Sequence, residues 1–225
     1  MSVTIKEGID LTPLLGLSPT EPELSKLLSS LLPSSSSPSS LPTPSIASYP
    51  DIVYLSYHSL GLSLSFEPTI SSYKPKYKLT SLDQLECDKL YCVGIDVYNH
   101  ESEEDEESEK KEKKKQTSST TTAKEYDQFP LYPILLPPPS SKPNSFPLTP
   151  TTTGKDLVAA YGEPTRKGGG DTKGMGIWTE WTKEGIMIEW KSSGLGAWDT
   201  GGESKWRVLS LFEGGVGKGK EDDDE

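Results

Sequence analysis

The chain is poor in the residues on which most catalytic sites depend. Its only histidines are His58 and His100, and histidine is the side chain whose ordinary pKa suits proton transfer near neutral pH. We expect His58 in a hairpin loop and His100 at the start of a charged run, and neither has a nucleophile beside it in the sequence. The sequence therefore does not indicate acid–base or nucleophilic catalysis.

Cysteine is equally scarce. Cys87 and Cys92 are the only two, and two thiolates do not complete a zinc site without further ligands. We expect both to be reduced thiols in or beside a strand. Gly154-Lys155 and Gly217-Lys218 lack the rest of a phosphate-binding loop, and the aspartates at 222–224 resemble a solubilising tail. The sequence therefore predicts no metal and no cofactor.

Long apolar runs are missing as well. Only 32% of the residues are hydrophobic, and no stretch approaches the ~18 apolar residues of a membrane span. The first ten residues are polar and mixed and do not resemble a secretory signal. We therefore expect a protein of the cytoplasm or the nucleus, not secreted and without a membrane span. The Ser/Thr-rich stretches favour a eukaryotic source.

The acidic charge is concentrated in two segments. The net charge is −11, and residues 101–115 and 218–225 together carry −6 of it. Both segments are of low complexity, and such composition is typical of disorder. Clustered Lys and Arg, which a nucleic-acid partner would require, are not apparent. We therefore predict no nucleic-acid partner.

One pattern occurs twice in the chain. Aromatic residues coincide at three positions of the main aligned segment, and Gly61 coincides with Gly185. An internal repeat of this kind determines the architecture of a protein. The matching segments are 17–20 with 148–151, 53–67 with 177–191, and 95–98 with 209–212.

Each copy of the pattern predicts one helix followed by three antiparallel strands. Leucines spaced at i, i+3, i+4 and i+7 predict a first helix that begins at a Thr20–Glu23 capping box. Thr153 and Asp156 predict the cap of a second helix over 154–161. Period-two alternation of apolar residues predicts strands at 52–57, 62–66, 90–98, 177–181, 186–190 and 206–212.

The expected fold is α+β, with two tandem helix–strand–strand–strand units that form one antiparallel sheet with both helices packed on one face. A short edge strand is expected within 131–136, a loop at 168–170 and a Gly-rich excursion at 192–204. The predicted parts are a first unit at 1–98 with a Ser/Pro linker at 33–48, a disordered insertion at 99–128, a Pro-rich connector at 129–147, a second unit at 148–213 and a disordered acidic tail at 214–225.

The second unit also carries a family resemblance. Its helix is followed by Tyr161-Gly162-Glu163-Pro164, a variable loop, a strand that ends in an aromatic residue, a glycine turn and an alternating strand. This order resembles the repeat of bacterial β-lactamase inhibitory proteins and of the related small lipoproteins of outer-membrane assembly. It is faintly similar to the repeated units of the eukaryotic phagophore assembly factor family.

The resemblance covers 148–213 and, more loosely, 14–98, where the Gly-x-Pro element is missing. It implies a helix-on-sheet fold whose members bind other proteins. It transfers no functional residue, because the shared positions are structural.

Tryptophan is unusually concentrated, since all five lie between 178 and 206. Alternation places Trp190 in the core, whereas Trp178 and Trp181 are three residues apart and cannot share one face of a strand. Trp198 lies in a Gly-rich loop, where it either fills a gap or anchors a partner, because Trp is enriched at binding hot spots. The candidate binding residues are Trp178, Trp181 and Trp198.

The sequence is compatible with three functions. The first is a nonenzymatic intracellular module that binds another protein, which a flat apolar patch rimmed by charge would favour. The second is a small-ligand or carbohydrate-binding domain with a Trp-rich groove in the second unit. The third is an enzyme, in which Asp171, Glu180 and Asp199 would converge with raised pKa values.

Overall fold

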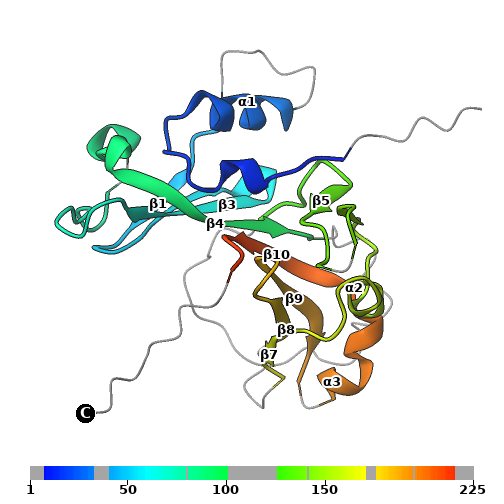
Figure 1. Cartoon of the computed structure of the whole chain (residues 1–225). Helices are drawn as coiled ribbons and strands as arrows, with labels where there is room; N and C mark the ends of the chain where they lie inside the picture. Colours follow the sequence, from blue (N-terminus) through cyan, green and yellow to red (C-terminus); the bar gives the residue numbers. More distant parts are fainter. Residues whose placement is uncertain are drawn as a thin grey trace, which may run out of the picture.

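A computed structural model describes residues 8–32, 41–79, 81–100, 126–140, 142–170, 176–194 and 196–215. One antiparallel sheet of eight strands dominates it, in the order β1-β2-β3-β4-β10-β9-β8-β7 (Figure 1). The mixed α and β class with a large antiparallel sheet is as predicted. The strands are β1 (Ser45–Ser48), β2 (Val53–Tyr57), β3 (Leu62–Pro68), β4 (Leu90–Tyr98), β7 (Arg166–Gly168), β8 (Gly176–Trp181), β9 (Ile186–Ser193) and β10 (Trp206–Phe212).

The remaining elements are small. A separate sheet pairs β5 (Ile134–Leu136) with β6 (Phe146–Leu148). The α-helices are α1 (Pro22–Ser30), α2 (Gly154–Tyr161) and α3 (Ala197–Thr200). The 3-10 helices are η1 (Thr12–Leu14), η2 (His58–Leu60), η3 (Leu82–Gln84), η4 (Cys87–Lys89) and η6 (Gly201–Glu203).

The order of the strands reverses at the centre of the sheet. The first half, β1 to β4, runs from one edge to the middle, and the second half, β7 to β10, runs from the other edge to the middle. The two halves meet where β4 pairs with β10. Residues more than a hundred positions apart in the chain therefore lie side by side.

The two hairpins pair in the same register. Each turn ends in a glycine with positive φ, Gly61 at +56° and Gly185 at +70°. A left-handed backbone of this kind favours glycine because it has no Cβ. The paired residues are Leu55 with Leu64 and Tyr57 with Leu62 in β2–β3, and Thr179 with Ile188 and Trp181 with Ile186 in β8–β9.

The third strand of each half also pairs in a matching way. Phe66 pairs with Cys92 after a register shift, and Trp190 pairs with Trp206 beside another shift. The first shift lies next to Gly94, which pairs with Ser65. The residue that each shift skips lies in the central strand of its half, Val93 in β4 and Arg207 in β10.

The core lies between one face of the sheet and the elements that cover it. Leu24 of α1 lies against Leu64, Phe66 and Cys92 of the sheet. Burial raises the pKa of the Cys92 thiol to about 12, so this cysteine is an inert core residue. Trp190 lies in the core as expected. Leu28, Leu64, Phe66, Ile188 and Trp190 are at most 4% exposed, whereas Leu27 is only half-buried.

The start of α1 differs from the expectation. Thr20 does not cap the helix; its hydroxyl lies 3.1 Å from that of Ser18. Glu21 is the N-cap and Pro22 the first helical residue, a position where the missing N–H and fixed φ of proline suit the helix. The second cap is as predicted, since the backbone N–H of Thr153 donates to Asp156 at 2.8 Å.

Two expectations about loops are wrong, those for 45–48 and for Gly168. The residues at 45–48 are not linker but β1, because the turn after them lets Ser48 pair with Val53. The short strand expected within 131–136 is present as β5, which pairs with β6 in the separate two-stranded sheet. Gly168 is not in a loop but in β7, opposite Trp178. The excursion at 192–204 contains the end of β9 and the helices α3 and η6.

The boundaries of the insertion also differ. Most of it, 101–125, lies outside the described residues, as do 33–40 of the linker and 216–225 of the tail. Asn99, however, is 1% exposed, and its amide donates to the carbonyls of Pro150 and Trp206 at 2.9 Å. Tyr126 stacks on Tyr98. The residues at both ends of the insertion therefore belong to the packed structure.

Candidate functional site

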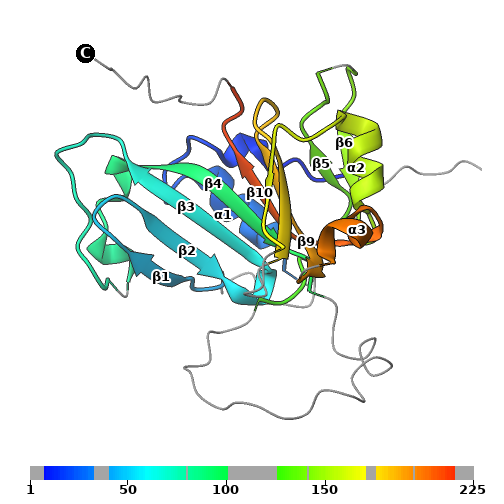
Figure 2. The same cartoon turned by 90° about the horizontal axis from the view of Figure 1, so that it is seen from below.

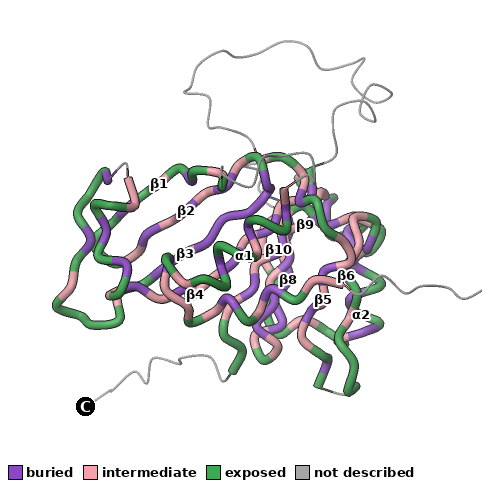
Figure 3. Tube along the Cα trace, turned by 90° about the horizontal axis from the view of Figure 1, so that it is seen from above, coloured by how far each residue is buried: buried purple, intermediate pink, exposed green. Residues whose placement is uncertain are grey.

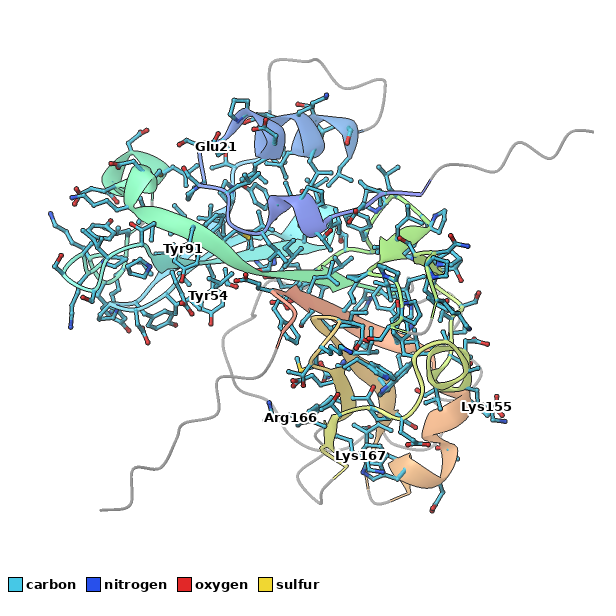
Figure 4. The ribbon with its side chains drawn as sticks, viewed as in Figure 1. Glu21, Tyr54, Tyr91, Lys155, Arg166 and Lys167 are labelled. Carbon is cyan, nitrogen blue, oxygen red and sulfur yellow. The ribbon has the colours of Figure 1, made fainter. Side chains whose placement is uncertain are left out.

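The sheet has a second face, which we call the open face. It carries the side chains that alternate with the core residues. Figure 2 shows this face with α1 behind the strands, and Figure 3 shows the opposite side with α1 in front. Figure 4 shows Tyr54 and Arg166 on the side of the sheet away from Glu21 and α1.

A row of paired residues, polar in every strand except β9, crosses the eight strands of the open face. The two serine hydroxyls at its β2–β3 position lie 3.3 Å apart, the hydroxyl of Ser210 donates to Asp96 at 2.6 Å, and Arg166 pairs with Glu180 at 3.3 Å. Neighbouring strands are ~4.8 Å apart, so the row is about 34 Å long. From β1 to β7 this polar row is Ser45, Ser56, Ser63, Asp96, Ser210, Met187, Glu180 and Arg166.

Asp96 lies at the centre of the polar row. Burial raises the pKa of its carboxyl group, and the hydrogen bond from Ser210 opposes that shift. Among the residues that the structure describes, no ion pair with Asp96 is found. An amine or guanidinium from outside would stabilise its ionised form, because a nearby opposite charge offsets desolvation.

Aromatic residues flank the polar row on both sides. Tyr54 and Phe212 lie on one side, and Tyr98 and Trp178 on the other. All four are half-buried, so each presents part of a ring to the surface. Tyr126 extends this flank, because its ring stacks on Tyr98 with centroids 3.7 Å apart.

A cavity of about 700 Å³ opens at one end of the central strands. We call it the end cavity. Its lining includes Leu15, Glu67, Tyr91, Val93, Thr182 and Phe212, together with Glu213 to Gly215. The hydroxyl of Tyr91 donates to Glu67 at 3.4 Å. Apolar walls with a few carboxylate and hydroxyl groups are typical of a binding pocket of this size.

The three tryptophans that the sequence singles out do not come together. Trp181 is 2% exposed and donates its indole N–H to the carbonyl of Gly162 at 3.0 Å, so it belongs to the core. Trp178 lies on the open face, with the guanidinium of Arg166 6.0 Å from its ring centroid. Trp178 is thus the one of the three that lies beside the polar row.

Trp198 lies on α3 and is 42% exposed. Its indole N–H donates to the carbonyl of Gly169 at 3.2 Å, and the amine of Lys167 lies 5.8 Å from its ring centroid. It therefore covers the Gly-rich segment after β7 while leaving part of its ring exposed.

The carboxylates named for an enzyme are also separated. Asp171 is outside the described residues. Glu180 is 7% exposed and accepts hydrogen bonds from Arg166 and Thr182, whereas Asp199 is exposed on α3. Within the described ranges, no group of three His, Cys, Asp or Glu side chains is placed to hold a metal ion. In the same ranges we find no helix with the length and apolar character to cross a bilayer.

Four residues of the open face were not among the binding residues predicted from the sequence, namely Asp96, Tyr98, Tyr126 and Phe212. The sequence feature that indicates the position of Asp96 is the alternation within 95–98, where a carboxylate lies between two apolar residues of one strand. Alternation alone puts Asp96 on the face opposite the core. It does not reveal that Ser210 lies beside it.

A comparison of the chain with family models, with curated proteins and with solved structures finds no match. The resemblance of 148–213 to the β-lactamase inhibitory protein family therefore stays a prediction.

Proposed function

We propose that this chain is a nonenzymatic intracellular module that binds another protein through the open face of its sheet. The observation that carries the proposal is the polar row between two aromatic flanks. Half-buried aromatic rings bury much apolar area at little entropic cost, and polar groups among them determine orientation. Protein interfaces combine the same features.

The frame of this module is, in our proposal, a duplicated unit with its helices on one face of the sheet. The matched register of the two hairpins and the corresponding bulges support the duplication. Leu24 of α1 lies against Phe66, and Tyr161 of α2 lies 5.8 Å from the ring of Trp181. Both helices thus contact core residues, which leaves the open face available to a partner.

A Trp-lined groove for a small ligand or a sugar is less well supported. Trp181, Trp190 and Trp206 are at most 2% exposed, so their rings are unavailable for stacking. The lining of the end cavity contains no tryptophan. Protein binding therefore accounts better for the aromatic residues that do reach the surface.

The test compares variants of the open face with a variant of the helix side. Tyr54→Ser with Trp178→Ser removes one ring from each flank, and Val158→Ser removes a side chain of α2 that is 38% exposed. Each tagged protein is used to capture partners from source cells, and the amounts are normalised to folded protein. The double variant should lose the interactors that the wild type and Val158→Ser retain. Retention of the same interactors by the double variant would contradict the proposal.

A further inference from the structure

The two hairpin turns make the same contacts with the central strands. The backbone N–H of Tyr98 donates to Gly61 at 2.9 Å, and that of Phe212 donates to Gly185 at 3.0 Å. The carbonyl of His58 accepts from Gly61 at 3.2 Å, as that of Thr182 accepts from Gly185 at 3.3 Å. Tyr98 therefore corresponds to Phe212, and His58 to Thr182, as in the sequence alignment of the two halves.

In the first half, the chain itself fills the space beside this pair. Tyr126 stacks on Tyr98 at 3.7 Å with an interplanar angle of 5°, and its ring lies 4.3 Å from that of His58. The backbone N–H of Asp127 donates to His58 at 2.9 Å, and that of Phe129 donates to Tyr98 at 3.0 Å. An extended segment with an aromatic residue is thus held against the turn.

In the second half, the corresponding place is the end cavity. Phe212 and Thr182 both line it. The backbone N–H of Gly215 donates to Thr182 at 3.4 Å, which corresponds to the bond of Asp127. The described residues at this point, Gly214 and Gly215, have no side chains, and no ring within the described part of the chain stacks on Phe212.

We propose that the end cavity binds an aromatic side chain from an extended segment of a partner protein, in the place that Tyr126 takes in the first half. This inference rests on the proposed function, because it takes the ligand to be a protein. The cavity of about 700 Å³ is in the size range of pockets for drug-sized ligands, so it has room for an aromatic side chain and for part of the residues beside it. The ring would lie on Phe212, as Tyr126 lies on Tyr98.

The charge at the end cavity indicates the neighbours of that aromatic residue. Glu67 and Glu213 both line it and would attract a segment with Lys or Arg beside the ring. The tail of this chain does not fit the description, because residues 216–225 contain no aromatic residue and five acidic ones. The partner segment is therefore basic and aromatic.

The first test uses peptides with the full-length chain. The probes are Gly-Lys-X-Lys-Gly with Tyr, Phe or Ala at X, and tyramine as a small cationic phenol. Backbone NMR shifts of Thr182, Phe212 and Val93 report binding at the end cavity. We expect the Tyr and Phe peptides to saturate these shifts at about 1 mM or below, and the Ala peptide and tyramine to bind roughly tenfold more weakly or not at all.

Equal binding of the Ala peptide would overturn the aromatic specificity. If tyramine bound as tightly as the Tyr peptide, the ligand would be a small molecule and not a protein segment. If only residues outside the end cavity shifted, the end cavity would not be the binding site. Since these outcomes use the unaltered protein, they do not depend on whether a variant folds.

The second test uses matched charge reversals. Glu67→Lys alters the end cavity, and Glu23→Lys alters an exposed residue of α1. Glu67→Lys should weaken binding of the Tyr peptide roughly fivefold or more, while Glu23→Lys should leave it unchanged. Equal effects of the two changes would overturn the role of the cavity charge. If the peptides fail to bind while Tyr54→Ser with Trp178→Ser still abolishes partner capture, the cavity inference fails and the open-face function stands.

Discussion

A carboxylate is ordinarily solvated, yet Asp96 lies in the middle of a sheet where its main partner is a hydroxyl group. Burial penalises the charged form, so the pKa of Asp96 is raised above its usual 3.8. The folded protein then holds a group that is more easily protonated than in the unfolded chain. The consequence is a dependence of stability on pH.

The first prediction concerns this residue. A raised pKa means that the stabilising contribution of protonated Asp96 is fully present below its unfolded pKa and is lost as the pH rises through the folded pKa. Asp96→Asn removes the charge and keeps an oxygen that accepts from Ser210. Its urea midpoint should exceed that of the wild type at pH 7 and match it near pH 3. Asp51→Asn, at an exposed site, is the control, and a lower midpoint for Asp96→Asn at pH 7 would contradict the prediction.

At the scale of elements, the hairpins depend on residues that fit only one face or one backbone conformation. Phe66 of β3 is 1% exposed and lies against Leu24 of α1. Gly61 has φ +56°, and a Cβ there would lie 2.3 Å from the carbonyl oxygen of Asp127. Gly185 has φ +70°, and a Cβ there would lie 2.1 Å from that of Phe212.

The second prediction is that Phe66→Ala lowers the free energy of unfolding by about 3–5 kcal/mol, the usual cost for a buried aromatic ring. The adjacent Glu67→Ala, on the other face and exposed, should change it by less than about 0.5 kcal/mol. Denaturant unfolding measures both. A cost below about 1 kcal/mol for Phe66→Ala would mean that β3 presents its other face to the core.

The third prediction separates backbone strain from close packing. Gly16 has φ +82° with nothing within 4 Å of its Cβ position, so Gly16→Ala should cost only about 1 kcal/mol, the strain of a left-handed residue. Gly61→Ala and Gly185→Ala add a clash with backbone and should each cost clearly more. Denaturant unfolding measures the loss of unfolding free energy. Equal losses at all three sites would show that a Cβ at Gly61 or Gly185 does not clash with the backbone beside the turn.

At the scale of the whole molecule, the two halves share one sheet and one core. β4 and β10, the innermost strands of the two halves, pair over five residues. Neither strand is therefore an exposed edge of the sheet. Tyr98 and Tyr126, on either side of 101–125, are in ring contact. The two ends of that segment are therefore already close together without it.

The fourth prediction follows from this proximity. Replacing 101–125 by a short Gly/Ser linker should preserve a single cooperative unfolding transition and change the melting temperature by no more than a few degrees, because loop-closure entropy varies slowly with length. Calorimetry measures both quantities. A protein that loses cooperativity would show that the removed segment takes part in the core.

Local chemistry was enough to predict much of this protein. The strand pattern identified β2, β3, β4, β8, β9 and β10, because burial on one face of a sheet favours alternation of apolar residues. The Thr153–Asp156 cap was equally local. Thr20 is not the N-cap because the helix begins at Pro22, which suits the first helical position. The capping-box motif alone does not include this preference of the neighbouring proline.

Alternation along each strand is enough to predict which side faces the core, and the glycines are enough to predict where the chain turns. Which strands are neighbours is a property of the folded molecule and does not follow from these local patterns. Asp96 meets Ser210, Tyr126 covers Tyr98, and Phe212 is left beside a cavity, because β4 and β10 pair across more than a hundred residues. Spacing along the chain reports only contacts within a strand or a turn, whereas the candidate site arises from contacts between strands that pairing brings together.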